Sequence, residues 1–161
     1  MIPDQAGQEF SKLVAIMAKL RAPDGCPWDL EQTFDSIKKY TLEETYEVIN
    51  AIDERDWPGL CEELGDLILQ PVFYAQMAQE QGAFAFADVV AAINAKMIRR
   101  HPHVFGDAAV HSTEEQSELW EQIKRAERGD QFTASILDRV KPSIPEWPRA
   151  LKLQAAAAEV G

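Results

Sequence analysis

The sequence predicts an all-α fold, a helical bundle built on an antiparallel helix hairpin. Apolar residues recur at intervals of three and four along most of the 161-residue chain, which is the spacing of amphipathic helices. No segment of useful length alternates apolar and polar residues as a half-buried strand does. Turn-forming residues gather between the helical stretches, for example at residues 22–33 and 55–58. Helices packed against helices are therefore the expected architecture.

Three helices are expected in the first half of the chain. The first ends near Leu20 and is followed by an ordered loop at residues 22–33, which is rich in turn formers. The second runs from about residue 35 to residue 54. The third begins near Pro58, a residue suited to a first helical turn, and ends near residue 81. Pro71 lies within it, and we expect a kink there because proline interrupts the helical hydrogen bonds.

Three further helices are expected in the second half, at about residues 87–100, 112–128 and 149–160. The first of these is followed by His101-Pro102-His103, which we interpret as a helix-terminating loop because no cysteine or acid at supporting spacing would complete a metal site. Ser112 and Glu115 have the spacing of a capping box, which predicts the start of the next helix. Three prolines between residues 142 and 148 mark a linker.

The composition restricts the classes of function. The 27 acidic residues outnumber the 16 lysines and arginines, and the formal net charge is −11, so the chain lacks the basic surface that non-specific nucleic-acid binding requires. No apolar run reaches the length of a membrane span. The first ten residues lack the pattern of a signal peptide, and the two cysteines, Cys26 and Cys61, do not make a disulfide framework. We therefore expect a cytoplasmic protein whose partners are neither nucleic acids nor membranes.

Two pairs of acidic residues occupy matching places on the second and third predicted helices: Glu44 with Glu47, and Glu63 with Asp66. In each pair the first residue lies at the edge of the apolar stripe, and the second lies roughly 60° further round in the same sense. The turn at residues 55–58 is short, so the two helices should pack antiparallel. Because equal offsets on antiparallel helices lie on one side of the hairpin, we expect the four carboxylates to share one groove.

A shared groove brings like charges together. The midpoints of the two pairs differ in level by roughly 5 Å at the helical rise, and packed helix axes lie about 8–10 Å apart, so these side chains can reach a common cation. Without a cation, neighbouring carboxylates raise one another's pKa and oppose packing. Oxygen-only ligands favour a hard ion, Mg²⁺ or Mn²⁺, and neither helix has the Glu-x-x-His motif of a di-iron bundle. A solvated acidic face is the alternative interpretation.

A basic face follows on the next predicted helix, where Lys96, Arg99 and Arg100 are spaced three and four apart. These residues are candidates to bind phosphate groups; cations near a helix C-terminus also complement the helix dipole. Asn94, on the same helix, is a candidate to contact a sugar or a phosphate, or is a plain exposed residue. Trp28, in the loop before the second helix, would either stack on a base or fill a core or interface position.

Four motifs occur in order along the first two thirds of the chain: Gly-Cys-Pro-Trp-Asp at residues 25–29, Tyr-Thr-Leu-Glu-Glu-Thr-Tyr-Glu at 40–47, Glu-Glu-Leu-Gly-Asp-Leu at 62–67 and Arg-Arg-His-Pro-His-Val-Phe at 99–105. Together they resemble the MazG nucleoside triphosphate pyrophosphohydrolases over about residues 10–107. The resemblance implies Mg²⁺-dependent hydrolysis of a nucleoside triphosphate to the monophosphate and pyrophosphate. It also implies helical hairpins that pair in a homodimer or higher assembly and so complete the core.

The acidic motifs of that family fall on Glu43, Glu44, Glu47, Glu63 and Asp66, which are the expected catalytic set. The resemblance assigns the last four to metal binding, and it assigns Glu43 to supporting the site or orienting water. It assigns the basic face on the following helix to phosphate binding. Metal ions held in this way would position water for attack on the α-phosphorus.

Longer members of the family carry two such domains, and this chain resembles the first. We therefore expect a MazG-like helical domain at residues 8–130, and a linker with a helical segment at residues 131–161 that resembles the start of a second copy. Two other functions stay open. One is an acidic helical module that serves dimerisation or regulation with weak or no catalysis; the other is a narrow-specificity relative that acts on dUTP, dCTP or phosphoribosyl-ATP.

Overall fold

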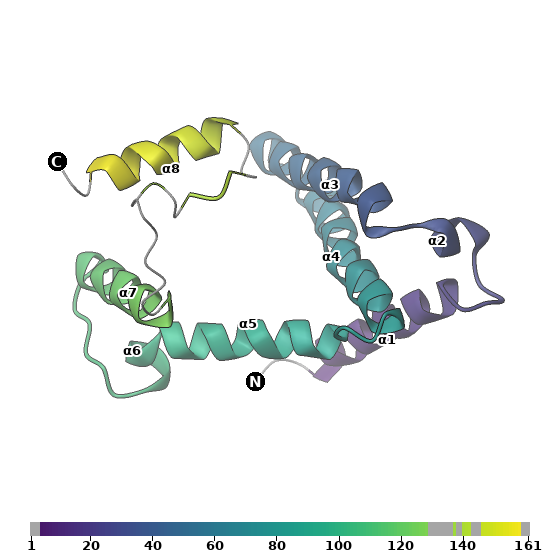
Figure 1. Cartoon of the computed structure of the whole chain (residues 1–161), viewed down its shortest axis with the longest axis horizontal. Coiled ribbons are helices and arrows are strands. Elements are labelled where there is room, and N and C mark those ends of the chain that lie inside the picture. The colour runs from purple at the N-terminus through teal and green to yellow at the C-terminus, as the bar shows by residue number, and fades with distance from the viewer. Residues whose placement is uncertain (1–3, 129–136, 138–139, 143–145, 159–161) are drawn as a thin grey trace. The chain divides into compact units, whose positions relative to one another are not determined.

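The fold is entirely helical. The computed structural model describes residues 4–128, 137, 140–142 and 146–158, and every regular element among them is a helix (Figure 1). The all-α prediction is confirmed. In the same described part of the chain, each helix is too short or too polar to cross a membrane.

The chain forms two compact units, residues 1–98 and residues 99–161. The first unit contains α1 (Asp4–Leu20), α2 (Pro27–Glu31), α3 (Phe34–Glu54), α4 (Trp57–Glu80) and most of α5 (Phe86–Arg100). The second contains the end of α5 together with α6 (Pro102–Phe105), α7 (Thr113–Arg128) and α8 (Glu146–Ala158). The domain boundary expected between residues 130 and 131 lies outside the described residues.

Helices α3 and α4 lie side by side and run in opposite directions (Figure 1). Thr33 begins α3 with a reciprocal capping box, in which its side chain accepts a hydrogen bond from the Ser36 backbone and its own backbone donates to the Ser36 side chain. Arg55 ends α3 in the left-handed conformation with φ at 59°. The Asp56 carboxylate then accepts a hydrogen bond from the Gly59 backbone at 3.1 Å and caps α4. A reversal this short leaves the two helices antiparallel.

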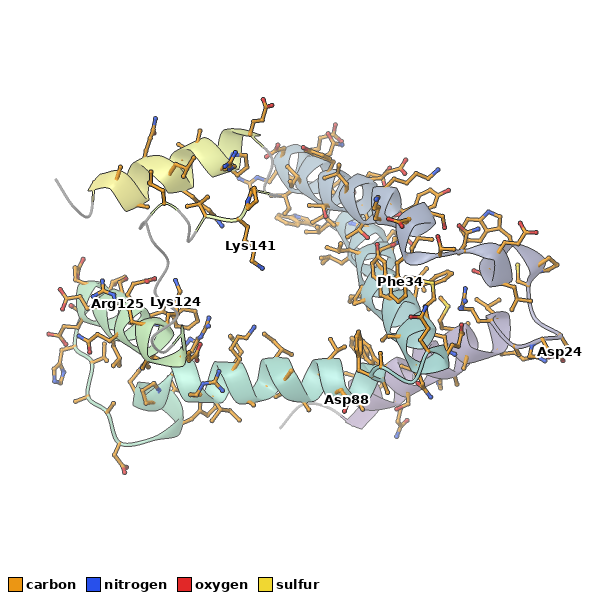
Figure 2. All side chains as sticks on the ribbon, in the orientation of Figure 1. Asp24, Phe34, Asp88, Lys124, Arg125 and Lys141 are labelled. Atoms are coloured by element: carbon orange, nitrogen blue, oxygen red, sulfur yellow. The ribbon has the colours of Figure 1, made fainter. Side chains whose placement is uncertain are left out.

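The core of the first unit lies where α1 and the start of α3 meet the second half of α4. Its buried members are Met17, Ile37, Val72, Phe73 and Met77. Phe34, labelled in Figure 2, stacks on Tyr74 with ring centroids 6.0 Å apart and so joins α3 to α4 beside this core. The first half of α4 and the second half of α3 contribute little to the core. As a result, the side chains that carry the acidic motifs lie on the more open end of the hairpin.

That open end also exposes a stripe of large apolar side chains on both helices. Their exposed fractions lie between 37% and 61%, which is high for residues of this type. The stripe consists of Leu42, Tyr46, Ile49 and Ile52 on α3, and Trp57, Leu64 and Ile68 on α4. Spacings of three, four and seven place the members of each helix on one face.

The expected helices are confirmed, and their ends differ from the predicted ones by a few residues. Three local expectations are wrong. The loop at residues 22–33 contains the five-residue helix α2. Helix α6 begins at Pro102, directly after His101, so residues 101–103 start a new helix instead of forming only a loop. Pro148 lies in the first turn of α8, where its missing N–H costs nothing, so the linker ends earlier than expected. Helix α4 continues through Pro71.

The predicted capping box at the start of α7 is half confirmed. Ser112 accepts a hydrogen bond from the Glu115 backbone at 3.1 Å, as predicted. The Glu115 carboxylate reaches one residue further back and accepts from the His111 backbone at 2.8 Å. Two backbone donors are satisfied in either arrangement, so α7 begins where the sequence places it.

Candidate functional site

The hairpin brings three acidic side chains of the predicted site together. Glu44 comes from α3, and Glu63 and Asp66 come from α4, one turn apart. One carboxylate oxygen from each lies within 4.8 Å of the others. Glu44 and Glu63 are half-buried and Asp66 is exposed, so the cluster is open to a ligand on one side while the hairpin supports it on the other.

The environment of Glu44 disfavours its charged form. Burial raises the pKa of the Glu44 carboxyl, and the negative charge of Asp66 raises it further. A hydrogen bond and a charge from Glu47 act in the same direction, followed by the charge of Glu43. Glu44 therefore interacts with three of the other predicted catalytic residues, and every one of these interactions opposes its ionisation.

The pKa of Glu63 is raised for the same kind of reason. Burial is again the largest cause, followed by the negative charges of Glu47, Asp66, Glu62 and Asp56. Glu47 thus acts on both half-buried members of the cluster and belongs to it electrostatically. The charges that act on Glu44 and Glu63 are all negative, so no described lysine or arginine of the first unit compensates this concentration of negative charge.

This donor set fits a hard divalent ion. All of its ligand atoms are carboxylate oxygens, which Mg²⁺ and Mn²⁺ prefer. The oxygens are close enough to share one ion, and the raised pKa values mark a site where an added positive charge would relieve repulsion. Glu44, Glu63 and Asp66 would hold the ion directly, with Glu47 beside them.

A pocket of about 310 Å³ opens next to the acidic cluster and shares Glu44 with it. Trp28 and Tyr40 form an aromatic wall, with ring centroids 6.3 Å apart and ring planes inclined by 54°. Asp29 and Gln70 supply the other polar groups, and core residues form the rest of the lining. Trp28 is 51% exposed, so it is not a core residue.

Tyr40 and Gln70 line this pocket and were not among the candidates of the sequence analysis. Helical periodicity offered a signal for both, since Tyr40 lies four residues before Glu44 on α3 and Gln70 lies four residues after Asp66 on α4. Gln70 is buried and accepts a hydrogen bond from Thr41 at 3.4 Å. Because Gln70 lines the Glu44 pocket, this contact joins the two helices at the pocket wall.

Two residues of the predicted basic face have partners within the second unit. Arg99 donates to Glu127 at 2.7 Å, and Arg100 donates to both oxygens of the same carboxylate, the shortest contact being 2.6 Å. The Arg100 guanidinium also lies over the Trp120 ring, 5.3 Å from its centroid. Lys96 is half-buried on α5 in the first unit. The basic face is thus divided between the two units.

Glu127 illustrates what paired guanidinium groups do to a carboxylate. Hydrogen bonds from Arg100 and then Arg99 lower the pKa of Glu127 to about 2. Its side chain is only 20% exposed. For a phosphate group to occupy these arginines, it would have to displace this carboxylate.

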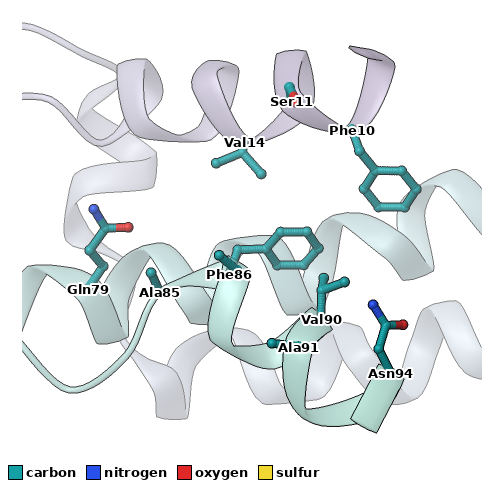
Figure 3. Close-up of a pocket in the computed structure, with 10 residues that line it drawn as sticks. Phe10, Ser11, Val14, Gln79, Ala85, Phe86, Val90, Ala91 and Asn94 are labelled. Carbon is teal, nitrogen blue, oxygen red and sulfur yellow. The ribbon is translucent and has the colours of Figure 1, made fainter. Parts of the chain in front are cut away.

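Asn94 lines a different pocket, of about 660 Å³, between α1 and α5 (Figure 3). Phe10 and Phe86 stack across this pocket with centroids 6.1 Å apart, and Val14 and Val90 extend its apolar lining. It shares no lining residue with the Glu44 pocket. The structure therefore does not bring Asn94 to the acidic cluster.

Comparisons with known proteins agree with the motifs. The model of the MazG nucleotide pyrophosphohydrolase domain matches residues 32–105. The chain is 52% identical to the nucleoside triphosphate pyrophosphohydrolase of Escherichia coli K12 over 154 residues, which cover 95% of this chain and 59% of that protein. It is 47% identical to the nucleoside triphosphate pyrophosphohydrolase/pyrophosphatase MazG of Thermotoga maritima over 157 residues, or 98% and 60% of the two chains.

Among solved structures, a mazG-related protein from Thermotoga maritima superposes with a TM-score of 0.60 at 27% identity. The superposition covers 71% of this chain and 97% of that one. The present chain spans about 60% of the length of the two curated relatives. The domain match includes every acidic residue of the cluster and the whole α3–α4 hairpin. By its motifs, its sequence relatives and its fold, the chain belongs to the MazG family.

Proposed function

We propose that this domain hydrolyses nucleoside triphosphates to the monophosphate and pyrophosphate with Mg²⁺, or alternatively Mn²⁺, at the acidic cluster. The observation that carries the proposal is the convergence of Glu44, Glu63 and Asp66 within 4.8 Å without a compensating cation among the charges that act on them. The relatives from E. coli and T. maritima are named nucleoside triphosphate pyrophosphohydrolases, which supports the substrate class and the type of reaction.

A divalent ion held by Glu44, Glu63 and Asp66 would offset charge on the triphosphate and lower the pKa of the attacking water. The protein's own contribution is to hold the ligand oxygens of Glu44, Glu47, Glu63 and Asp66 in one groove. Glu43, directly before Glu44 on the same helix, is an exposed carboxylate, suited to accept a hydrogen bond from water and orient it toward the α-phosphorus. The packing of α3 against α4 keeps these side chains in register.

The substrate is proposed to lie across two neighbouring features. Its nucleoside part occupies the Glu44 pocket, where Trp28 and Tyr40 offer aromatic faces to a base. Its phosphates lie at the acidic cluster. Lys96, Arg99 and Arg100 stay the phosphate ligands predicted from the sequence, and a phosphate group could reach the two arginines only by displacing Glu127.

We further propose that a second copy of the chain covers the exposed apolar stripe of α3 and α4, giving a homodimer or a higher assembly. The stripe runs along the same hairpin as the acidic cluster, so pairing would also exclude water from the groove. Sedimentation of the wild type and of Leu64→Asp tests this. We expect the wild type to sediment as a dimer or larger species and the variant to be smaller.

Product analysis tests the reaction. In H₂¹⁸O with Mg²⁺, attack at the α-phosphorus places the label in the nucleoside monophosphate, whereas attack at the β-phosphorus places it in pyrophosphate. We expect label in the monophosphate only, and no turnover by Asp66→Asn with unchanged helical content. Release of orthophosphate, or label in pyrophosphate, would refute α-attack.

One observation favours a second candidate, a regulatory or dimerisation module with little catalysis. Arg99 and Arg100 are already paired with Glu127, so two of the three predicted phosphate ligands are engaged. Calorimetric titration with Mg²⁺ and Mn²⁺ separates the two functions. Saturable heat that Asp66→Asn abolishes supports the enzyme, and its absence from the wild type supports the module. A panel that includes dUTP and dCTP then decides between broad and narrow specificity.

A further inference from the structure

We propose that Asp29 determines nucleoside recognition in the Glu44 pocket: its carboxylate accepts a hydrogen bond from an O–H or N–H donor on the nucleoside part of the ligand. This inference rests on the proposed function, because it takes the pocket beside the acidic cluster as the nucleoside site. Asp29 lines that pocket together with Trp28, Tyr40 and Glu44.

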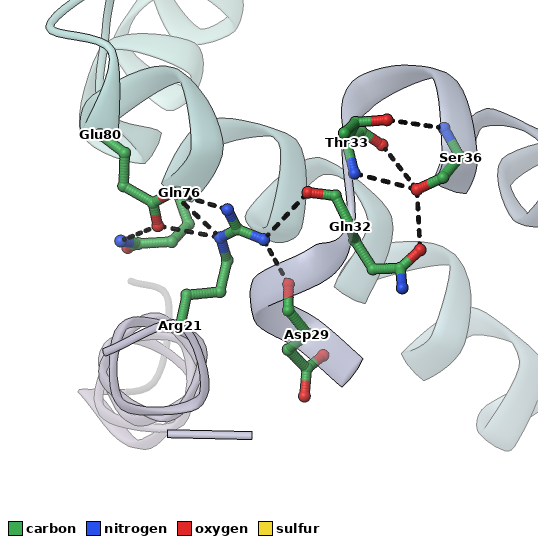
Figure 4. Close-up of polar contacts among 7 residues, drawn as sticks. All are labelled: Arg21, Asp29, Gln32, Thr33, Ser36, Gln76 and Glu80. Carbon is green, nitrogen blue, oxygen red and sulfur yellow. Dashed lines mark hydrogen bonds and ion pairs between the residues drawn. The ribbon is translucent and has the colours of Figure 1, made fainter. Parts of the chain in front are cut away.

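The first support is burial without a donor. Asp29 is only 9% exposed. Its backbone carbonyl accepts a hydrogen bond from Arg21, but within the described residues nothing donates to its carboxylate. Figure 4 shows this carboxylate directed away from Arg21, with no interaction drawn to it. The carboxylate oxygens are not among the fully enclosed, unpartnered atoms of the described residues, so they are accessible from the pocket that Asp29 lines. A ligand that brings a donor into the pocket can therefore reach a carboxylate that has no protein donor.

The second support is that Asp29 is separate from the metal cluster. The charges that raise the pKa of Glu44 come from Asp66, Glu47 and Glu43, and Asp29 is not among them. Nor does its carboxylate belong to the group of oxygens that converge within 4.8 Å. Asp29 and Glu44 thus line one pocket but are not placed to bind the same ion. The part of a nucleotide that would reach Asp29 is the nucleoside and not the phosphates.

The third support is that the segment carrying Asp29 is held firmly from behind. The Arg21 side chain is 8% exposed and donates to Glu80 on α4, with Nε–Oε1 at 2.9 Å and Nη2–Oε2 at 2.7 Å. It also donates to the carbonyl oxygens of Asp29 and Gln32, on either side of the end of α2 (Figure 4). Arg21 is therefore a positioning residue, which fixes α2 through its backbone and leaves the Asp29 carboxylate free for the pocket.

Two kinds of donor on a nucleoside could supply the hydrogen bond, a sugar hydroxyl or an exocyclic amino group of the base. Three substrates distinguish them: ATP, its 2′,3′-dideoxy analogue and purine riboside triphosphate, which lacks the amino group. Asp29→Leu removes the acceptor, and Asp29→Asn removes the charge but keeps one acceptor oxygen. Asp24→Asn, an exposed acid in the preceding loop, is the matched control.

We expect Asp29→Leu to lower kcat/KM for ATP by about 10-fold to 100-fold, which corresponds to one hydrogen bond to a charged group. Asp29→Asn should lose less, and Asp24→Asn should match the wild type. The difference between wild type and Asp29→Leu should disappear for whichever analogue lacks the relevant donor. Long-range electrostatics alone predicts the opposite change, a higher kcat/KM for Asp29→Leu, because removing a negative charge should favour binding of a triphosphate.

The same variants carry a readout that does not depend on turnover. If the carboxylate lacks a donor in the free protein, Asp29→Leu and Asp29→Asn should melt no lower than the wild type, whereas Arg21→Leu should melt lower and weaken every substrate equally. Binding of AMP in EDTA, measured by calorimetry, should weaken in Asp29→Leu and not in Asp24→Asn.

The outcomes separate this inference from the proposed function. Suppose that the wild type hydrolyses ATP. If Asp29→Leu has the same kcat/KM, or if its loss of kcat/KM persists for both analogues, the role of Asp29 is refuted and the proposed enzymatic function is not. If the wild type hydrolyses no nucleotide, the proposed function is refuted. The affinity for AMP then decides whether Asp29 contributes to nucleoside binding. Equal AMP affinity in wild type and Asp29→Leu would refute it there too.

Discussion

The carboxylates of the two units have opposite surroundings. In residues 1–98, Glu44 and Glu63 are half-buried among other acids, and burial followed by negative neighbours raises the pKa of each. In residues 99–161, Glu127 lies between two guanidinium groups that lower its pKa to about 2. The same functional group is therefore satisfied in one place and left without a counter-charge in the other. A carboxylate with its partners in place stabilises a fold, and a cluster that lacks them is equipped to bind a cation.

The largest effect should follow from removing one member of the unsatisfied cluster. Glu63→Gln should lower turnover by more than about 100-fold, which is the upper end of what losing an outer-shell partner of a metal costs. Mg²⁺ should raise the Tm of the wild type and not of the variant, because only a site that binds the ion stabilises the folded state.

Without metal, Glu63→Gln should melt higher than the wild type, since it removes like-charge repulsion. Glu54→Gln, an exposed acid in the last turn of α3, is the matched control and should change neither quantity. Unchanged turnover and an unchanged response to Mg²⁺ in Glu63→Gln would remove the cluster from the mechanism.

Acidification should change the folding stability contributed by Glu44 and Glu63 and that contributed by Glu127 in opposite directions. A raised pKa means that the folded state binds protons more readily than the unfolded chain. The stability from protonating Glu44 and Glu63 is therefore fully present below their ordinary pKa of 4.5 and is lost as the pH rises through their raised values. A lowered pKa works the other way, so the stability from Glu127 is present above 4.5 and is lost as the pH falls toward about 2.

Melting curves in EDTA across this range check both signs. Glu63→Gln should weaken the pH dependence of the Tm above pH 4.5. Glu127→Gln should weaken it between pH 4.5 and pH 2. If both substitutions altered the same pH range, the contrast between the two regions would be wrong.

A smaller effect is expected at neutral pH from weakening the ion pairs of Glu127 with Arg99 and Arg100. Glu127→Gln removes the charge from the hydrogen bonds of Arg99 and Arg100, and Arg100 is itself only 19% exposed. The Tm should fall by several degrees while Mg²⁺ affinity in calorimetry stays the same. Glu118→Gln, an exposed acid on the same helix, should leave the Tm unchanged. A loss of Mg²⁺ binding in Glu127→Gln would mean that the two regions act together.

The smallest effect is expected at Asp56, whose carboxylate both makes a stabilising hydrogen bond and repels another carboxylate. It caps α4 through the Gly59 backbone, and its charge is the last of the causes that raise the Glu63 pKa. Asp56→Ala should cost about 1 kcal/mol of folding free energy from the lost cap, partly offset by weaker repulsion at Glu63. Urea denaturation measures the net value, with Asp53→Ala as the control. A net gain in stability would show that repulsion outweighs the cap.

Local periodicity accounts for what could be read from the chain. The spacing of apolar residues predicted the helices with small errors at their ends, and the equal offsets of Glu44 and Glu63 from the apolar stripes predicted that they meet. Both predictions depend on neighbours within one or two turns and on a reversal at residues 55–58, which the sequence encodes directly. Tyr40 and Gln70 were within reach of the same reasoning.

Long-range partners were decided only by the tertiary structure. Arg99 and Arg100 form a plausible phosphate face by spacing, yet their partner Glu127 lies 27 residues or more further along the chain. Helix α2 is too short to be stable alone, and Arg21 and Glu80, 59 residues apart, hold the segment in place. The burial of Asp29 beside Glu44 depends on the same contact. The sequence by itself determined which residues share a helix face, because that follows from backbone geometry, whereas the counter-charge that each acid receives depends on which distant helices the packing brings together.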